Sequence, residues 1–111
     1  MIDVVNVGFS NSLKYVKELS RESSDPDIIP ALQECIWVYK TVVETSVNLA
    51  ERAVKQGVLK FGEKAMKDAS IEAEICMMGF PDGKVPERIM GWTPMLQGVS
   101  IVTASLIKML E

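Results

Sequence analysis

The spacing of apolar residues constrains the fold of this chain more than any other feature, because it recurs near 3.6 residues almost throughout. Apolar residues three and four positions apart share one face of an α-helix, whereas a half-buried strand needs strict alternation. No convincing alternating run is present, so the pattern predicts an all-α protein. Breaks rich in Pro, Gly and Ser separate four amphipathic segments. We therefore predict helices over residues 3–22, 30–55, 60–78 and 94–110.

Each predicted helix carries one apolar stripe, and four such stripes are buried most economically in a bundle. The 111 residues are enough for one domain, so we expect a single up-and-down four-helix bundle over residues 1–111. Thr93 and Pro94 are expected to begin the last helix as its N-cap and first helical position. The stripe of the second helix is predicted to contain Leu32, Cys35, Ile36, Tyr39, Val42, Val43, Ser46, Leu49 and Ala53.

Composition excludes several classes of function. The net charge is −3 and no Lys/Arg cluster is long enough to follow a phosphate backbone, so we expect no nucleic-acid partner. The longest apolar stretch, residues 99–110, is too short and too polar to span a membrane, and the first residues lack the early basic charge of a signal peptide. The absence of histidine argues against a metal site, a cofactor and acid–base catalysis.

Four acidic residues near the third predicted helix invite a catalytic interpretation. At such spacings on an amphipathic helix, carboxylates usually form the solvent face, so we expect no catalytic residue and no enzyme activity. The four residues are Glu63, Asp68, Glu72 and Glu74.

The two cysteines fall on interior stripes of the second and third predicted helices. If these helices are antiparallel neighbours, Cys35 and Cys76 lie at similar heights, with an offset of roughly 7 Å at 1.5 Å per residue. One interpretation is a disulfide, which would place the protein in an oxidising compartment. The other is a pair of buried free thiols, because free Cys packs as a small hydrophobe.

The turn between these two helices carries an apolar and basic triplet, Leu59-Lys60-Phe61, after a predicted helix stop at Gly57. Phe61 could be the first core residue of the third helix, with Lys60 solvated. Alternatively, the triplet could be a tip that enters a pocket of another protein. The lysines at this end of the hairpin, Lys55, Lys60, Lys64 and Lys67, favour an ordinary solvated face. Trp37 and Trp92 are candidate exposed anchors, and we expect one of them to pack instead.

Three segments, ALQECIWVY, KFGEKAMKDASIEAEIC with the following GF, and SIVTASLIKML, resemble the plant invertase inhibitor and pectin methylesterase inhibitor family. The resemblance implies a four-helix bundle and a disulfide between Cys35 and Cys76. It also implies secretion to the plant cell wall and apoplast, or delivery to the vacuole, and binding to a carbohydrate-active enzyme without catalysis. The residues that carry it are Leu32, Cys35, Tyr39, Ala65, Ala69, Cys76, Phe80, Leu106, Ile107 and Leu110.

The chain departs from the family pattern at two places. Family members usually begin with a helical hairpin that carries a first cysteine pair, and this sequence starts after that point, as an N-terminally short member would. We therefore expect helix 3–22 to expose Val5 or Phe9 and to support self-association. The start of the family's last helix often carries Arg-Asn, where this chain reads Gly91-Trp92-Thr93-Pro94.

Invertase inhibitors of this family resemble one another in a Pro-Lys-Phe triplet at the turn, which enters the sucrose pocket of the target. Leu59, Lys60 and Phe61 match it, with Leu59 in place of the proline. Glycosidase pockets carry paired carboxylates, which suit a lysine. The resemblance therefore implies a 1:1 inhibitor of acid invertase. The alternatives are a pectin methylesterase inhibitor that covers the pectin cleft with helix faces, and a non-inhibitory storage- or allergen-like helical module.

Overall fold

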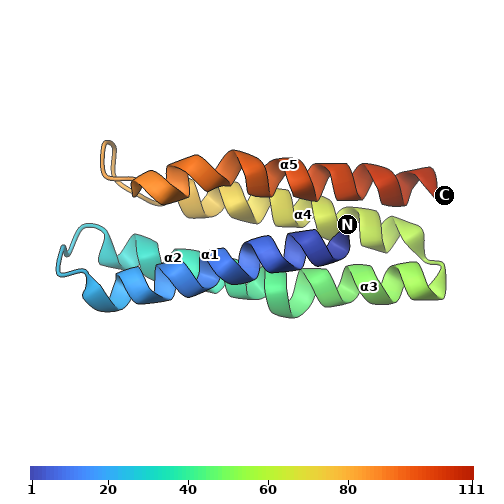
Figure 1. The fold of residues 1–111 in the computed structure, drawn as a ribbon, viewed down its shortest axis with the longest axis horizontal. Coiled ribbons are helices and arrows are strands. Elements are labelled where there is room, and N and C mark those ends of the chain that lie inside the picture. Colours follow the sequence, from blue (N-terminus) through green and yellow to red (C-terminus); the bar gives the residue numbers. More distant parts are fainter.

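Five α-helices and one π-helical segment make up the chain in a computed structural model that describes residues 1–111. In chain order they are α1 (Ile2–Glu22), α2 (Ile29–Thr41), η1 (Val42–Ser46), α3 (Val47–Gln56), α4 (Leu59–Met78) and α5 (Glu87–Met109). The segments α2, η1 and α3 are continuous and act as one long helix. Four antiparallel helical rods therefore run along the long axis of the molecule (Figure 1). The predicted all-α four-helix bundle is confirmed.

The core lies along the bundle axis, where the four rods meet. Phe9 and Tyr39 are fully buried and pack edge to face, with ring centroids 5.7 Å apart. Burial raises the pKa of Tyr39 to about 12, although the indole N–H of Trp92 donates a hydrogen bond to its hydroxyl at 3.0 Å. No helix in the structure is both long enough and apolar enough to cross a membrane.

The first helix buries the apolar residues that we expected it to expose. Val5 is 1% exposed and Phe9 is 0% exposed, so that prediction is wrong. The reason is that α1 packs against both α2 and α5, and its apolar stripe fills the space between them. The apolar residues of α1 that are exposed are instead Val4 and Val7.

The π-helical segment η1 changes which residues of the second rod reach the core. Our prediction treated residues 30–55 as one regular α-helix and placed Leu49 in the stripe. A π-helix bonds residue i to i+5, so it holds more residues in a turn and rotates everything that follows. As a result Val47 and Ala50 are buried, while Leu49 is 39% exposed. The prediction for Leu49 is wrong for this reason.

The last helix begins seven residues earlier than the expected start at residue 94. Pro86 is extended and Glu87 opens α5, where a carboxylate suits the helix dipole. Thr93 is not an N-cap: it is fully buried, and its hydroxyl donates to the carbonyl of Ile89 at 2.6 Å. Pro94 lies inside the helix on its exposed side.

Packing around the first turns of α5 explains why the helix continues through a proline. An internal proline costs about 3 kcal/mol through a lost hydrogen bond and steric conflict. Against this, Ile89 is fully buried, Trp92 packs edge to face on Tyr15 at 5.1 Å, and the Arg88 guanidinium lies 4.9 Å from the centre of the Tyr15 ring. These contacts need helical backbone before Pro94.

Lys84 joins the two loops at the end of the bundle away from the α3–α4 turn. Its Nζ lies 2.8 Å from Asp27 Oδ2 and 3.4 Å from Asp25 Oδ2. The pKa of Asp25 is lowered, first by the hydrogen bond from the Asp27 backbone N–H, with desolvation acting in the opposite direction and Lys84 lowering it further. A carboxyl group whose pKa is lowered by folding stabilises the fold at pH values above its ordinary pKa. This stabilisation is lost as the pH falls through the lowered pKa of the folded state.

Replacing Lys84 by glutamine should therefore raise the pKa of Asp25 part of the way to its ordinary value, because the Asp27 N–H remains. The melting temperature should fall slightly at neutral pH, since exposed ion pairs are weak. Wild type and Lys84→Gln should converge as both carboxylates become protonated. NMR titration of Asp25 and melting curves over pH test this, with Lys84→Arg as the control. A difference in melting temperature that is independent of pH would contradict it.

Candidate functional site

The turn between α3 and α4 is held by a glycine-dependent helix cap. Gly57 adopts φ 76°, a left-handed conformation that favours glycine. The N–H of Val58 donates to the carbonyl of Ala53 at 3.0 Å, and the N–H of Gly57 donates to Val54 at 3.3 Å. These two bonds form a Schellman motif, which ends α3 sharply. The predicted helix stop at Gly57 is confirmed, and the turn that follows has a defined geometry.

The first turn of α4 is left open to an outside acceptor. Leu59 opens the helix without a side-chain cap, and no acidic residue lies in its first turn. The Phe61 N–H donates only to the carbonyl of Val58, at 3.1 Å. Helix N-termini carry a partial positive charge, which favours a negatively charged group nearby. This end of the hairpin therefore suits a carboxylate.

The three residues of the triplet take different positions. Leu59 is half-buried and packs on the core. Lys60 is exposed and forms no ion pair within the chain. Phe61 is 60% exposed, so the interpretation of Phe61 as a core residue is wrong. The next residue, Gly62, is the one that faces the core, and this turns the Phe61 ring outward.

Phe61 borders a shallow groove of about 310 Å³ on the side of the hairpin. Leu49 and Val58, which are both exposed, share this groove with it. Val58 could have been found from the sequence as an apolar residue at a turn. Leu49 could not, because its exposure depends on η1. The lining consists of Leu49, Arg52, Ala53, Gln56, Val58 and Phe61.

The two cysteines form a disulfide nearer the opposite end of α4. Cys35 and Cys76 are fully buried, their Cα atoms are 4.5 Å apart, and the S–S distance is 2.11 Å. The bond joins α2 to α4, and no free cysteine remains. The predicted bridge is confirmed, and the alternative of two free thiols is wrong.

Comparison with known proteins bears directly on this arrangement. No family profile matches the chain. Over 81 residues, however, the chain is 38% identical to a protein of Arabidopsis thaliana named cell wall / vacuolar inhibitor of fructosidase 1. The match covers 73% of this chain. The chain belongs to the plant invertase and pectin methylesterase inhibitor family. It spans 38% of the length of that relative.

The lysines of this inhibitor-family hairpin are not equivalent. Lys64 pairs with Asp68 at 3.1 Å, and Lys67 pairs with Glu63 at 2.8 Å. The hydrogen bond from Lys67 is the main reason that the pKa of Glu63 is lowered. Lys55 and Lys60 have no such partner. Lys60, the lysine of the triplet, is therefore available to a partner protein, whereas Lys64 and Lys67 are paired within the chain.

The four acidic residues considered above do not converge on one point. Glu63 and Asp68 are paired with lysines, and Glu74 accepts a hydrogen bond from Gln97 at 3.5 Å. Burial raises the pKa of Glu72, with a further contribution from Asp68. The structure contains no group of three or more His, Cys, Asp or Glu side chains that could hold a metal ion.

The two tryptophans differ in exposure. Trp92 is half-buried and bound to Tyr39, whereas Trp37 on α2 is 70% exposed. Trp37 lies 19 residues before Gln56 at the end of α3, or about 29 Å along the helix. It is too far from Phe61 to enter the same pocket, so it belongs to a separate surface.

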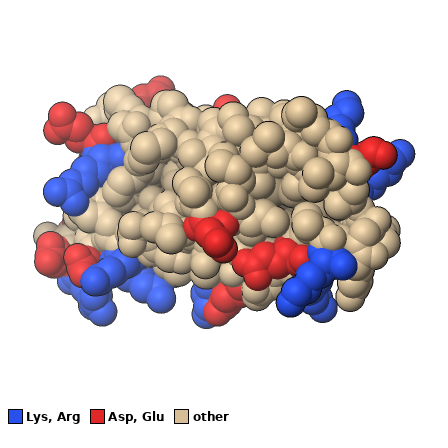
Figure 2. Space-filling view, turned by 45° about the vertical axis from the view of Figure 1, so that its right-hand side comes forward, with Lys and Arg blue, Asp and Glu red and all other residues tan.

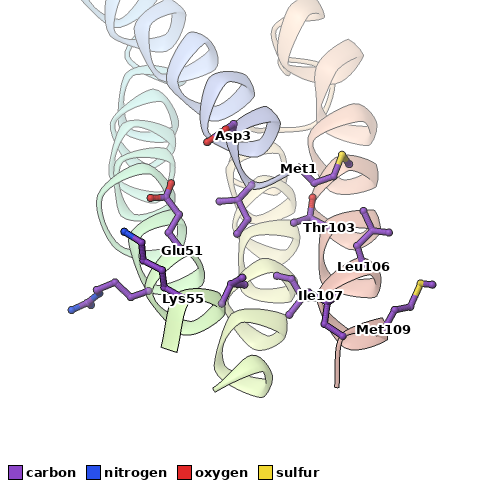
Figure 3. A pocket seen from close by; sticks show the side chains of 12 residues that line it. Met1, Asp3, Glu51, Lys55, Thr103, Leu106, Ile107 and Met109 are labelled. Carbon is purple, nitrogen blue, oxygen red and sulfur yellow. The ribbon is translucent and has the colours of Figure 1, made fainter. Parts of the chain in front are cut away.

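The largest groove, of about 740 Å³, lies where α1 begins between α3 and α5. Figure 3 shows Met1, Thr103, Leu106, Ile107 and Met109 on one side of it, with Glu51 and Lys55 on the other. Its lining is mainly apolar, which does not suit a sugar. Neither Lys60 nor Phe61 lines it. Sequence reasoning did not predict this groove, because it depends on how far α1 extends along its neighbours.

Proposed function

We propose that this chain is a proteinaceous inhibitor of a plant carbohydrate-active enzyme, and specifically of a cell-wall or vacuolar acid invertase. The observation that carries the proposal is the hairpin tip, where a 60% exposed Phe61 lies beside the unpaired Lys60. The relative named as an inhibitor of fructosidase supports it. The chain acts by binding and has no catalytic role.

The chemistry of the tip matches the chemistry of a glycosidase pocket. Such pockets hold two carboxylates around the scissile bond. Lys60 offers a compact cation, and the uncapped N-terminus of α4 adds positive potential behind it. Phe61 supplies apolar contact area with few rotatable bonds. Insertion of Leu59, Lys60 and Phe61 would block the pocket in a 1:1 complex that contains no bond for the target to cleave.

The disulfide supports a location outside the cytosol. Disulfides form and persist in oxidising compartments. Cys35–Cys76 is such a bond, and the name of the relative includes both cell wall and vacuole. We place the protein in the apoplast or cell wall after secretion, or in the vacuole.

A pectin methylesterase is the second candidate target. Trp37 favours it, because an exposed aromatic residue on a helix face suits contact with an elongated cleft rather than insertion into a pocket. In this mode the faces of α2 and its neighbours would cover the cleft, and Lys60 and Phe61 would lie outside the interface.

Titration of the purified chain against an acid invertase and a pectin methylesterase, at mildly acidic pH, separates these functions. Invertase inhibition that is competitive with sucrose is the expected result, and Trp37→Ala should not affect it. Pectin methylesterase inhibition that is lost in Trp37→Ala would favour the second target. Inhibition of neither enzyme would contradict both proposals and leave a non-inhibitory helical module.

A further inference from the structure

The outer face of α5 carries no charge over most of its length. No charged residue occurs between Arg88 and Lys108. Figure 2 shows a broad area without charged side chains in the upper half of the view, at the height of α5 in Figure 1. Large exposed apolar patches usually mark interaction sites. The exposed apolar residues are Met90 (54%), Met95 (62%), Ile101 (45%), Val102 (49%), Leu106 (42%) and Met109 (80%).

We infer that this face binds a second copy of the chain, with the two α5 helices antiparallel and crossing at Gly98. Gly98 is the midpoint of α5, which runs from Glu87 to Met109. A Cβ added at Gly91 or at Gly98 would meet no atom within 4 Å, so the helix surface is open there. Small residues at a crossing let two helices approach closely.

The side chains on either side of Gly98 complement one another in this arrangement. A residue before Gly98 in one copy faces a residue the same distance after Gly98 in the other. Pro94 and Met95 therefore face Ile101 and Val102 of the second copy, and each contact occurs twice by symmetry. The central part of the interface is then entirely uncharged.

The charges at the two ends of α5 favour a second copy over other partners. Glu87 and Lys108 lie eleven residues before and ten residues after Gly98, or roughly 17 and 15 Å along the helix. In the antiparallel pair each Glu87 therefore lies within about 2 Å, along the helix axis, of the height of Lys108 of the other copy. Neither side chain forms an ion pair within its own chain. Arg88 is also close to the height of Lys108 of the other copy, but its guanidinium is held over the Tyr15 ring of its own chain, which keeps the two positive charges apart. A parallel pair would bring like charges together instead.

The size of the face predicts a weak dimer. From Met90 to Met109 it extends about 29 Å, and with a helix width of about 10 Å it offers roughly 300 Å² per copy. Stable complexes bury about 800 Å² per partner. We therefore expect dissociation constants in the micromolar range or weaker, and a dimer that forms reversibly with concentration.

Sedimentation equilibrium between micromolar and millimolar concentrations tests the inference. The mass should rise from 12.3 kDa towards twice that value. Gly98→Arg should keep the chain monomeric without lowering its melting temperature, because nothing surrounds that position and arginine favours a helix more than glycine does. The matched control is Val7→Arg at a 56% exposed position of α1, which should leave association unchanged.

Charge-exchange variants and cysteine variants test the antiparallel geometry. Glu87→Lys and Lys108→Glu should each weaken the dimer by roughly threefold or more, and the double exchange should restore it. Gly98→Cys should oxidise to a covalent dimer, whereas Met109→Cys should not, because the two Met109 residues lie at opposite ends of the pair.

Three results would overturn the inference. The first is a constant mass of 12.3 kDa at every concentration. The second is loss of association in Val7→Arg but not in Gly98→Arg, which would assign the contact to α1. The third is a monomeric chain in which Gly98→Arg weakens inhibition of invertase, which would assign the α5 face to the target enzyme.

Discussion

Reduction of the Cys35–Cys76 bond is expected to lower the free energy of unfolding by about 4 kcal/mol. The bond closes a loop with a sequence separation of 41, and its loss releases that part of the unfolded chain from constraint. For a domain of this size the melting temperature should fall by roughly 15 °C. Calorimetry of oxidised and fully reduced protein measures the change. Both sulfurs are buried, so reduction should be carried out in denaturant before refolding.

The double variant Cys35→Ala/Cys76→Ala provides the control for this experiment. It should melt at the temperature of the reduced protein, whether or not reductant is present. A titration of unreduced protein in denaturant should find no free thiol. Two reactive thiols, or equal melting temperatures before and after reduction, would show that the bond does not form or does not stabilise the fold.

Phe61→Ala should weaken binding to acid invertase by about 2 kcal/mol or more, close to 30-fold, as expected for a central anchor residue. Its melting temperature should change little, because the ring is 60% exposed. Lys60→Ala should lose a similar amount by leaving carboxylates of the target unpaired, and Lys60→Glu should lose more. Each variant needs both a dissociation constant and a melting curve.

Leu59 offers matched controls for these variants. Leu59→Ala removes a side chain that packs on the core, so it should lower the melting temperature more than Phe61→Ala does. Leu59 is the first residue of α4, where proline is well tolerated. Leu59→Pro should therefore keep the helix start, lose part of the core contact as Leu59→Ala does, and bind slightly more tightly. A large loss of stability in Phe61→Ala with unchanged affinity would contradict the proposed role of the tip.

The sequence predicted the fold class and most helix ends, because those features depend on local patterns. The disulfide, which joins residues 41 apart, was left open by the residues alone and was implied by the family resemblance. Apolar periodicity identified the four rods, and Gly57 ended α3 where its left-handed conformation was needed. The start of α5 was missed because Thr93-Pro94 has the pattern of a helix start. The buried Ile89 and the packing of Trp92 on Tyr15 outweigh that signal, and they depend on residues distant in the chain.

The candidate site could be located from the sequence but not described. The position of the triplet beside Gly57 indicated a turn, and the family resemblance indicated its role. Whether Phe61 faces the core depends on the rotation of α4, which is set by the close packing of Gly62 against Ala53, where a Cβ would lie 3.4 Å from that of Ala53. The roles of Leu59, Lys60 and Phe61 in binding stay a prediction.

The π-helical segment η1 limits which insertions and deletions this chain can tolerate. Loss of a single codon within Val42–Ser46 would convert η1 to ordinary α-helix and rotate the preceding part of the rod relative to α3 by about 100°. The core could be rebuilt only by re-pairing α2 with α4, so the disulfide and the face beside Phe61 could not both be kept. We therefore expect the number of residues between Cys35 and Leu49 to be constrained separately from their identity, so that substitutions are tolerated here far more readily than insertions or deletions.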